Sequence, residues 1–392
     1  MEIISDKNLS LHRENDRKMI KRAMQNVISQ RLFKGKAIVL IGARQVGKTT
    51  LLKEIFPNQN DLLWFNADDL PVRDFFSNVT IERFRSVIGK NKIVVVDEAQ
   101  RIENVGIKMK LITDNFPDVQ LVVTGSSSFE LANKINEPLT GRKFEYELFP
   151  LSFNEMAEEH GLFAEIQKLP IRLVYGMYPD VVCNPGDEKE ILSQLTNSYL
   201  YKDILEWERI KKPDKIVKLM KALAYQIGDE ISYNELSQIV ELDKGTVEKY
   251  INLLEQTKII FRLSSYSRNL RNELKFGRKI YFCDNGIRNA LINNFSDMEF
   301  RQDAGPLWEN FMVSELRKYN HYTQNHCNTY FWRTTQKQEI DYIEEKDGKL
   351  TAYEFKWNPK KKSRVASTFT SAYPECIVRT INPENFYQCL GL

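Results

Sequence analysis

The chain has 392 residues, of which 42% are hydrophobic and 28% are charged, proportions that are ordinary for a soluble globular protein. Lys and Arg exceed Asp and Glu by only three (56 − 53). The net charge therefore excludes a strongly basic or a strongly acidic protein and discriminates little else. Any nucleic-acid binding must come from local basic patches. At roughly 100 to 200 residues per domain, this length suggests two to four domains.

The cysteines, the histidines and the N-terminus exclude further classes of protein. The five cysteines lack C-x-x-C spacing and the four histidines form no ligand pattern, which argues against a disulfide framework and a zinc site. Residues 1–30 are too charged for a secretory signal, and no apolar run approaches the ~18 residues that span a membrane. We expect a cytoplasmic protein that begins with a weakly helical extension over residues 1–30.

An apolar run at residues 38–41 leads directly into a phosphate-binding motif and then into a helical pattern. The motif G-x-x-x-x-G-K-T and the residue after it are Gly42, Ala43, Arg44, Gln45, Val46, Gly47, Lys48, Thr49 and Thr50. Its glycines let successive backbone N–H groups point inward, while Lys48 reaches the β and γ phosphates and the Thr49 hydroxyl can hold Mg²⁺. The sequence therefore predicts the binding of ATP or GTP with Mg²⁺.

Strand-like runs alternate with helical patterns across residues 31–160, which predicts a parallel sheet covered on both faces by helices. The strands are expected at residues 37–41, 62–66, 93–97, 119–124 and 144–148. The third ends in Asp97, which can lie near Mg²⁺, and is followed by Glu98, which can lie beside the attacking water. The alternative is that Asp97 only caps a helix.

Two further residues of this domain could act on the nucleotide. Thr124 ends a strand expected between the two signature strands, where it could sense the γ phosphate, and Ser126 is a second candidate. Arg142 precedes the strand at 144–148, where it could act as an arginine finger on the nucleotide of a neighbouring subunit. That role requires a homo-oligomer, and the alternative is a surface ion pair.

The order of these features resembles the ATPases associated with diverse cellular activities (AAA), and more specifically a prokaryotic group in which this domain precedes a C-terminal domain of unassigned function. The resemblance is carried by residues 42–50, 96–101, 121–127, 148–153 and 267–270. It implies ATP binding and hydrolysis, and it leaves open what the ATP drives.

The middle of the chain is predicted to be largely helical. Residues 161–225 suggest a helical lid or connector, and residues 226–300 suggest a winged-helix domain. That domain would begin with a helix capped by Ser232 and Glu235, followed by a short turn, a second helix and a hairpin. The hairpin encloses a basic set, which could contact DNA or RNA, namely Arg268, Arg271, Lys275 and Arg278. The alternative is that this domain packs the ATPase against the C-terminal domain.

Residues 301–392 contain a second group of charged residues. Two strands are expected around a turn at residues 346–349, and the second carries Glu354 and Lys356, which share one face because they are two residues apart. Asp341 can join them across the hairpin. Two carboxylates that hold a divalent metal, with a lysine that activates water, suit phosphodiester hydrolysis.

This arrangement resembles the PD-(D/E)xK nucleases, which implies a restriction-endonuclease-like α/β fold. Glu309 matches the glutamate on the helix that precedes the core in many of these enzymes, and the resemblance covers residues 305–358. The alternative is an inactive scaffold in which Glu354 and Lys356 simply pair. A basic run at residues 360–364 could hold phosphates or be a solvated loop.

Together the patterns predict a regulatory or motor ATPase whose nuclease-like domain takes part in a nucleic-acid transaction. Two alternatives stay open. One is a DNA or RNA nuclease gated by ATP, and the other is an ATP-switched scaffold that binds another protein. A hexamer, a dimer and a monomer all fit the sequence.

Overall fold

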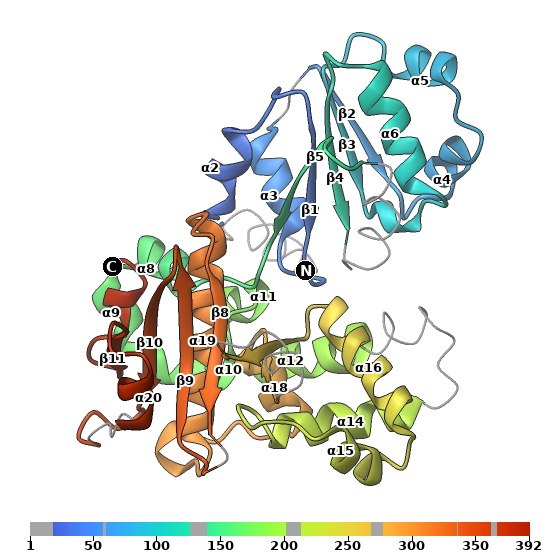
Figure 1. The fold of residues 1–392 in the computed structure, drawn as a ribbon. Helices are drawn as coiled ribbons and strands as arrows, with labels where there is room; N and C mark the ends of the chain where they lie inside the picture. Colours follow the sequence, from blue (N-terminus) through green and yellow to red (C-terminus); the bar gives the residue numbers. More distant parts are fainter. Residues whose placement is uncertain are drawn as a thin grey trace, which may run out of the picture.

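The computed structural model describes residues 19–57, 60–125, 139–200, 213–267, 277–334, 336–361 and 367–392. It has two lobes, one built on the sheet of β1 to β5 and the other on the sheet that contains β8 to β11 (Figure 1). Several predicted features lie outside the described residues, namely residues 1–18, Ser126, Arg268, Arg271, Lys275, Lys362 and Arg364.

The first sheet is parallel throughout and has the order β2-β3-β4-β1-β5. Its strands are β1 (Ala37–Ile41), β2 (Leu62–Asn66), β3 (Ile93–Asp97), β4 (Gln120–Gly125) and β5 (Lys143–Glu147). Strands β1, β3 and β4 are buried along their whole length, which is why they read as continuous apolar runs. The predicted parallel-sheet domain is thereby confirmed, with β4 between the two signature strands.

Helices cover both faces of this sheet, as the side chains of β1 show. Ile38 and Leu40 pack in one core with Leu51, whereas Val39 packs in the opposite core with Met109. The helices around the sheet are α2 (Met24–Ser29), α3 (Lys48–Ile55), α4 (Leu70–Ser77), α5 (Ile81–Ile88), the 3-10 turn η1 (Ala99–Arg101) and α6 (Val105–Asn115).

The middle of the chain is a series of helices, and a hairpin separates the last two of them from the rest. The helices are α8 (Phe153–His160), α9 (Leu162–Gln167), α10 (Leu169–Tyr175), α11 (Pro179–Cys183), α12 (Glu188–Gln194), η2 (Leu195–Leu200), α14 (Pro213–Tyr225), α15 (Tyr233–Val240), α16 (Lys244–Gln256), α18 (Asn285–Leu291) and η3 (Met298–Phe300). Ser232 caps α15 by accepting a hydrogen bond from the N–H of Glu235 at 3.3 Å. The hairpin strands are β6 (Ile260–Ser265) and β7 (Arg278–Phe282).

The second sheet has the order β11-β10-β9-β8-β6-β7, so it combines strands from two of the predicted domains. Its remaining elements are α19 (Ala304–Tyr322), β8 (Asn328–Arg333), β9 (Glu339–Lys346), β10 (Lys349–Phe355), α20 (Ser367–Ala372), β11 (Ile377–Ile381) and α21 (Phe386–Cys389). Strand β6 pairs with β8 in parallel, with Ser264 opposite Tyr330. The hairpin of residues 226–300 therefore extends the sheet of residues 301–392.

The described residues contain neither a helix that could span a membrane nor a disulfide bond. In the part of the chain that the structure describes, no helix is both long and apolar enough to cross a membrane. Within the same residues the cysteines form no disulfide bond.

Candidate functional site

The phosphate-binding loop connects the end of β1 to the start of α3. Gln45 and Gly47 have φ angles of 60° and 92°, left-handed conformations that help a loop to curl its N–H groups around an anion. Gly42 lies against the end of β5, where an added Cβ would collide with the carbonyl oxygen of Leu148. A glycine is therefore required at this position by the close approach of two backbones.

Lys48 lies inside the loop, with only 5% of the residue exposed. Its Nζ donates to the carbonyl oxygens of Gly42 and Ala43, both at 2.9 Å. These bonds hold the ammonium at the position where the β and γ phosphates of a nucleotide meet such a loop.

Asp97 and Thr124, at the ends of the adjacent strands β3 and β4, meet Thr49 at the start of α3. The Thr49 hydroxyl donates to Asp97 Oδ2 at 2.8 Å, and the Thr124 hydroxyl donates to Asp97 Oδ1. Asp97 does not cap the following helical turn, because η1 begins after Glu98 and has no side-chain cap. The carboxylate is instead occupied by the two hydroxyl groups. A hydroxyl beside a buried carboxylate is the oxygen donor set that Mg²⁺ prefers, so the residues fit this metal.

Glu98 is held in a left-handed conformation with φ 52° at the end of β3. Its N–H donates to the Thr124 hydroxyl at 3.1 Å, and its Oε2 accepts a hydrogen bond from Gln100 Nε2 at 2.6 Å. A non-glycine residue with positive φ is uncommon and costs roughly 1 to 3 kcal/mol, so the surrounding contacts must impose it. Gln100 was not singled out from the sequence. Its position two residues after Glu98 was the only local sign that it could contact that side chain.

A cavity of about 410 Å³ lies beside the loop and includes Lys48, Thr49 and Glu98 in its wall. Part of the wall comes from outside the motif, from the segment before α2, from the residue Leu151 just before α8 and from α11. These residues are Met19, Ile20, Arg22, Leu151, Pro179, Asp180 and Cys183. Their separation in the sequence explains why no local pattern pointed to them.

Arg22 links the phosphate-binding loop to the rest of the molecule, and sequence reasoning missed it. Its Nη1 donates to the carbonyl oxygen of Val46 at 2.6 Å, and its Nη2 donates to that of Phe149 at 2.7 Å. Its Nε donates to the buried carboxylate of Glu155 at 3.0 Å. The same guanidinium lies 3.5 Å from the hydroxyl of Tyr322 on α19. One buried charge therefore holds the loop, α8 and α19 together.

Arg142 lies far from the loop of its own chain. The N–H of Ala37, at the start of β1, donates to the Arg142 carbonyl, whereas the loop follows the other end of that strand. Five strand residues at ~3.3 Å each separate the two ends by roughly 16 Å. The guanidinium pairs with Asp114 at 2.6 Å on the surface. A catalytic role for Arg142 is therefore open only toward a neighbouring subunit.

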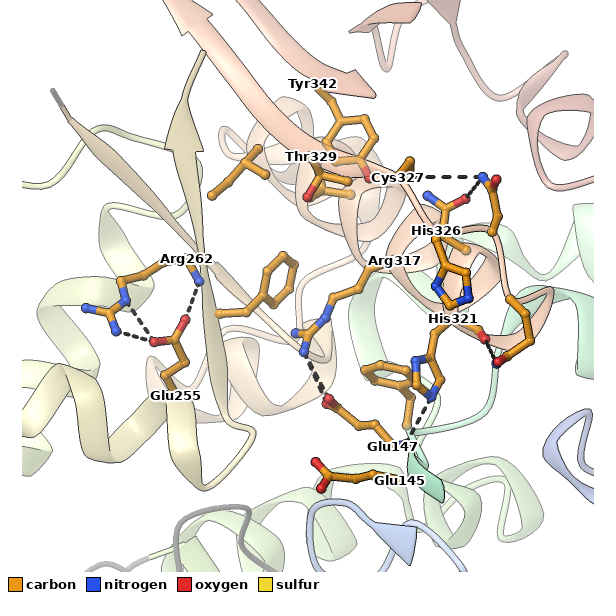
Figure 2. Close-up of a pocket in the computed structure, with 17 residues that line it drawn as sticks. Glu145, Glu147, Glu255, Arg262, Arg317, His321, His326, Cys327, Thr329 and Tyr342 are labelled. Carbon is orange, nitrogen blue, oxygen red and sulfur yellow. Dashed lines mark hydrogen bonds and ion pairs between the residues drawn. The ribbon is translucent and has the colours of Figure 1, made fainter. Parts of the chain in front are cut away.

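The last residue of β5, Glu147, joins the sheet of β1 to β5 to the second lobe (Figure 2). Its carboxylate lies 2.9 Å from Lys258 and 3.2 Å from Arg317. Burial alone would raise the pKa of Glu147. The two cations outweigh this effect and lower the pKa to about 2, below its usual value of 4.5. His321 Nε2 accepts a hydrogen bond from the Glu147 N–H at 3.0 Å, which requires a neutral imidazole, and burial lowers the pKa of His321 accordingly.

Figure 2 shows Arg317 and His321 pointing toward Glu147 from α19, at the wall of a cavity of about 490 Å³. The Arg317 guanidinium also stacks on Phe149 and Phe261, with ring centroids 5.1 and 4.6 Å away. The contacts around Glu147 thus combine ion pairs with aromatic packing. They form a second link between the lobes, beside that of Arg22.

The second lobe brings together the four residues predicted for a nuclease-like site. The elements α19, β8, β9, β10, α20 and β11 follow one another as helix, three strands, helix and strand. Lys356 Nζ lies 2.8 Å from Glu354 and 3.7 Å from Asp341, and the N–H of Phe355 donates to Asp341 at 2.7 Å. Glu309 reaches the same cluster from α19.

Further residues join this cluster that sequence reasoning did not assign to it. Glu309, Glu339 and Asp341 each offer an oxygen within 4.8 Å of one another. The Tyr281 hydroxyl donates to Glu309 at 2.7 Å, and Lys279 lies 2.9 Å from the same oxygen and also pairs with Glu339. Burial and the nearby carboxylates Glu309 and Glu354 raise the pKa of Asp341 to about 8. A hard divalent cation would fit these oxygen donors.

Comparisons with known proteins divide the chain into three matched segments. Residues 34–157 match the family described as AAA domain. Residues 166–298 and 304–386 match two families described as domains of unknown function, DUF8612 and DUF4143. The first match agrees with the parallel-sheet lobe, while the other two do not test the winged-helix or restriction-endonuclease-like predictions.

Individual similar proteins align with most of the chain. An uncharacterised protein of Methanocaldococcus jannaschii is 23% identical over 384 residues, which cover 91% of this chain and 82% of that protein. An uncharacterised protein of Mycobacterium tuberculosis is 23% identical over 329 residues, which cover 83% and 71%. Among solved structures, the Walker-type ATPase of Pyrococcus abyssi has a TM-score of 0.50 at 15% identity, covering 71% of this chain and 97% of that one. That likeness concerns the fold alone.

Proposed function

We propose that this chain, which contains an AAA-type P-loop ATPase domain, hydrolyses ATP and couples the reaction to its second lobe. The observation that carries the proposal is the meeting of Thr49, Asp97 and Thr124 at the strand ends beside Lys48 and Glu98. Phosphate binding, metal binding and water activation each have a candidate group there.

Each residue of the site has a distinct role in this proposal. The loop amides and Lys48 bind the β and γ phosphates, and Thr49 and Asp97 would hold Mg²⁺. The bound metal would supply positive charge that offsets the charge developing on the phosphate oxygens. Glu98 orients the attacking water and accepts its proton, held in place by Gln100.

The wall of the cavity offers a place for the base and ribose. The side chains of Ile20, Leu151 and Pro179 supply apolar surface next to the loop. A volume of about 410 Å³ falls in the range of roughly 300 to 1,000 Å³ that is common for small-molecule sites. The base would thus lie between the segment before α2 and the start of α11, so that both contact the nucleotide.

The links at Arg22 and Glu147 support coupling between the lobes. Arg22 binds the carbonyl of Val46 inside the phosphate-binding loop, and Glu147 directly precedes Leu148, whose backbone approaches Gly42. A shift of the loop on nucleotide binding would therefore act on α19 through both contacts. Arg142 would complete the site of a neighbouring copy, and turnover per subunit that rises with protein concentration, and falls in Arg142→Ala, would support this homo-oligomer.

The second lobe favours a second candidate activity, the metal-dependent cleavage of DNA or RNA. The observation behind it is that Glu309, Asp341, Glu354 and Lys356 converge on one edge of a helix-strand-strand-strand-helix-strand unit. The carboxylates would hold a divalent metal, and Lys356 would orient the water. The alternative is an inactive scaffold in which these charges pair with one another and the lobe binds a partner protein.

Two measurements test these proposals. In a direct titration, Lys48→Ala should lose tight ATP binding, and unchanged affinity would overturn the nucleotide site. ATP turnover and Mg²⁺-dependent cleavage are then followed for the wild type and Asp341→Ala, with and without single- and double-stranded DNA. DNA cleavage by the wild type that is absent in Asp341→Ala supports the nuclease. ATP turnover that does not change when DNA is added, with no cleavage in either protein, supports a protein-directed switch.

A further inference from the structure

A lysine from the middle of the chain lies inside the acidic cluster of the second lobe. Lys279 is on β7, and its side chain is only 1% exposed. Its Nζ lies 2.9 Å from Glu309 Oε1, forms an ion pair with Glu339, and lies 5.5 Å from the centre of the Phe331 ring. The ammonium is thus enclosed by carboxylates on one side and an aromatic ring on the other.

Two partners of Lys279 are carboxylates that a metal would need. Glu309 and Glu339 belong, with Asp341, to the group whose oxygens lie within 4.8 Å of one another. A hard cation binds through carboxylate oxygens of this kind. The ammonium and a divalent ion therefore draw on the same carboxylates, and their like charges repel at such close range.

We propose that Lys279 is a built-in counter-cation that competes with a divalent metal for Glu309, Glu339 and Asp341, and so holds the second lobe in a metal-excluded state. This inference rests on the metal site of the second candidate function. Two other cations each touch one carboxylate of the group, since Lys356 lies 3.7 Å from Asp341 and Arg333 lies 3.4 Å from Glu339. Lys279 differs from them because it is almost fully buried and pairs with two of the three carboxylates. Lys279 is the cation that shares an oxygen with the Tyr281 hydroxyl on Glu309.

The hairpin of β6 and β7, which carries Lys279, is connected to both lobes. Strand β7 pairs along its length with β6 and, at Lys279, also forms an isolated antiparallel bridge with Glu230. Strand β6 in turn meets β8 over a short register at Ser264 and Ser265. Lys258, just before β6, pairs with Glu147 of the ATPase sheet. A shift between the lobes would therefore act on the hairpin that carries Lys279.

Mn²⁺ binding to the full-length, nucleotide-free protein tests the competition. Bound Mn²⁺ is measured from the electron paramagnetic resonance signal of the free ion, and thermal unfolding is followed with and without Mn²⁺. Lys279→Met keeps the length of the side chain and removes its charge, and Lys349→Met changes an exposed lysine as the matched control. We expect Lys279→Met to bind Mn²⁺ at least ten-fold more tightly than the wild type and to become more stable to heat when Mn²⁺ is present. Adding Asp341→Asn to this variant should abolish both the tighter binding and the gain in stability.

Loss of Lys279 leaves buried carboxylates unbalanced, so Lys279→Met can fail to fold. Lys279→Gln, which removes the charge but keeps a hydrogen-bond donor toward Glu309, is the second variant and carries the same comparison. Equal, Asp341-dependent affinity in the wild type and these variants would overturn the role of Lys279 while leaving the metal site intact. No Asp341-dependent binding in any of them would overturn the metal site and this inference together.

Discussion

The Thr124 hydroxyl donates a hydrogen bond to Asp97 and accepts one from the N–H of Glu98 at 3.1 Å. A single side chain at the end of β4 thus fixes both acidic residues at the end of β3. This is possible because β4 lies between β1 and β3, so the three strand ends are adjacent. The orientation of the two acidic residues therefore depends on a residue outside either nucleotide signature.

Replacing Thr124 by valine keeps the shape of the side chain and removes both hydrogen bonds. We expect ATP turnover to fall roughly 10- to 100-fold, because Asp97 and Glu98 lose their alignment with the reacting groups. ATP affinity should change only a few-fold, since Lys48 and the loop amides stay in place. Thr113→Val is the matched control, because its hydroxyl bonds to the Met109 carbonyl within α6. Equal turnover in the two variants would contradict this role.

Arg22→Met should destabilise the junction of the phosphate-binding loop, α8 and α19. Glu155, which is 1% exposed, would keep its backbone partners but lose its charged one. Breaking a buried ion pair from one side costs about 3 kcal/mol or more. Urea unfolding measures the loss, with Arg31→Met as a control at a more exposed arginine. Adding Glu155→Gln to Arg22→Met should recover part of the stability, and a further loss would refute the pairing.

The ion pairs of Glu147 predict a dependence of stability on pH. Its pKa of about 2 lies below the reference value of 4.5, so its contribution is complete above about pH 5 and is lost as the pH falls toward 2. A shift of this size corresponds to at most about 3 kcal/mol. We expect the wild type to be more stable than Glu147→Gln at pH 7, with a difference that narrows below pH 5. If the difference in stability between the two proteins were the same at every pH between 7 and 3, the assignment of these ion pairs to Glu147 would be contradicted.

The nucleotide site could be predicted from the sequence because its chemistry is local. The loop from Gly42 to Thr49 and the pair Asp97 and Glu98 each occupy one strand end, and the alternation of strands and helices predicts the parallel sheet between them. The nuclease-like residues Asp341, Glu354 and Lys356 were similarly placed by one hairpin. In both cases, spacing along the chain determines proximity.

Contacts between distant segments could not be predicted in this way. Arg22 bonds to Phe149 and lies near Tyr322, and nothing in its neighbourhood distinguishes it from other charged residues of the N-terminal segment. Lys279 was expected only as a hairpin residue of the middle domain. Its place among the carboxylates depends on the parallel pairing of β6 with β8, which no local pattern of residues encodes.

The proposal that this chain hydrolyses ATP is tested most directly by Glu98→Gln. ATP affinity and turnover are measured on the same preparation, with Glu103→Gln as a control at an exposed glutamate. Loss of the group that activates water should leave ATP bound at wild-type affinity while turnover falls roughly 100- to 10,000-fold. Gln100→Leu should lower turnover by less. Normal turnover in Glu98→Gln would contradict the proposed mechanism.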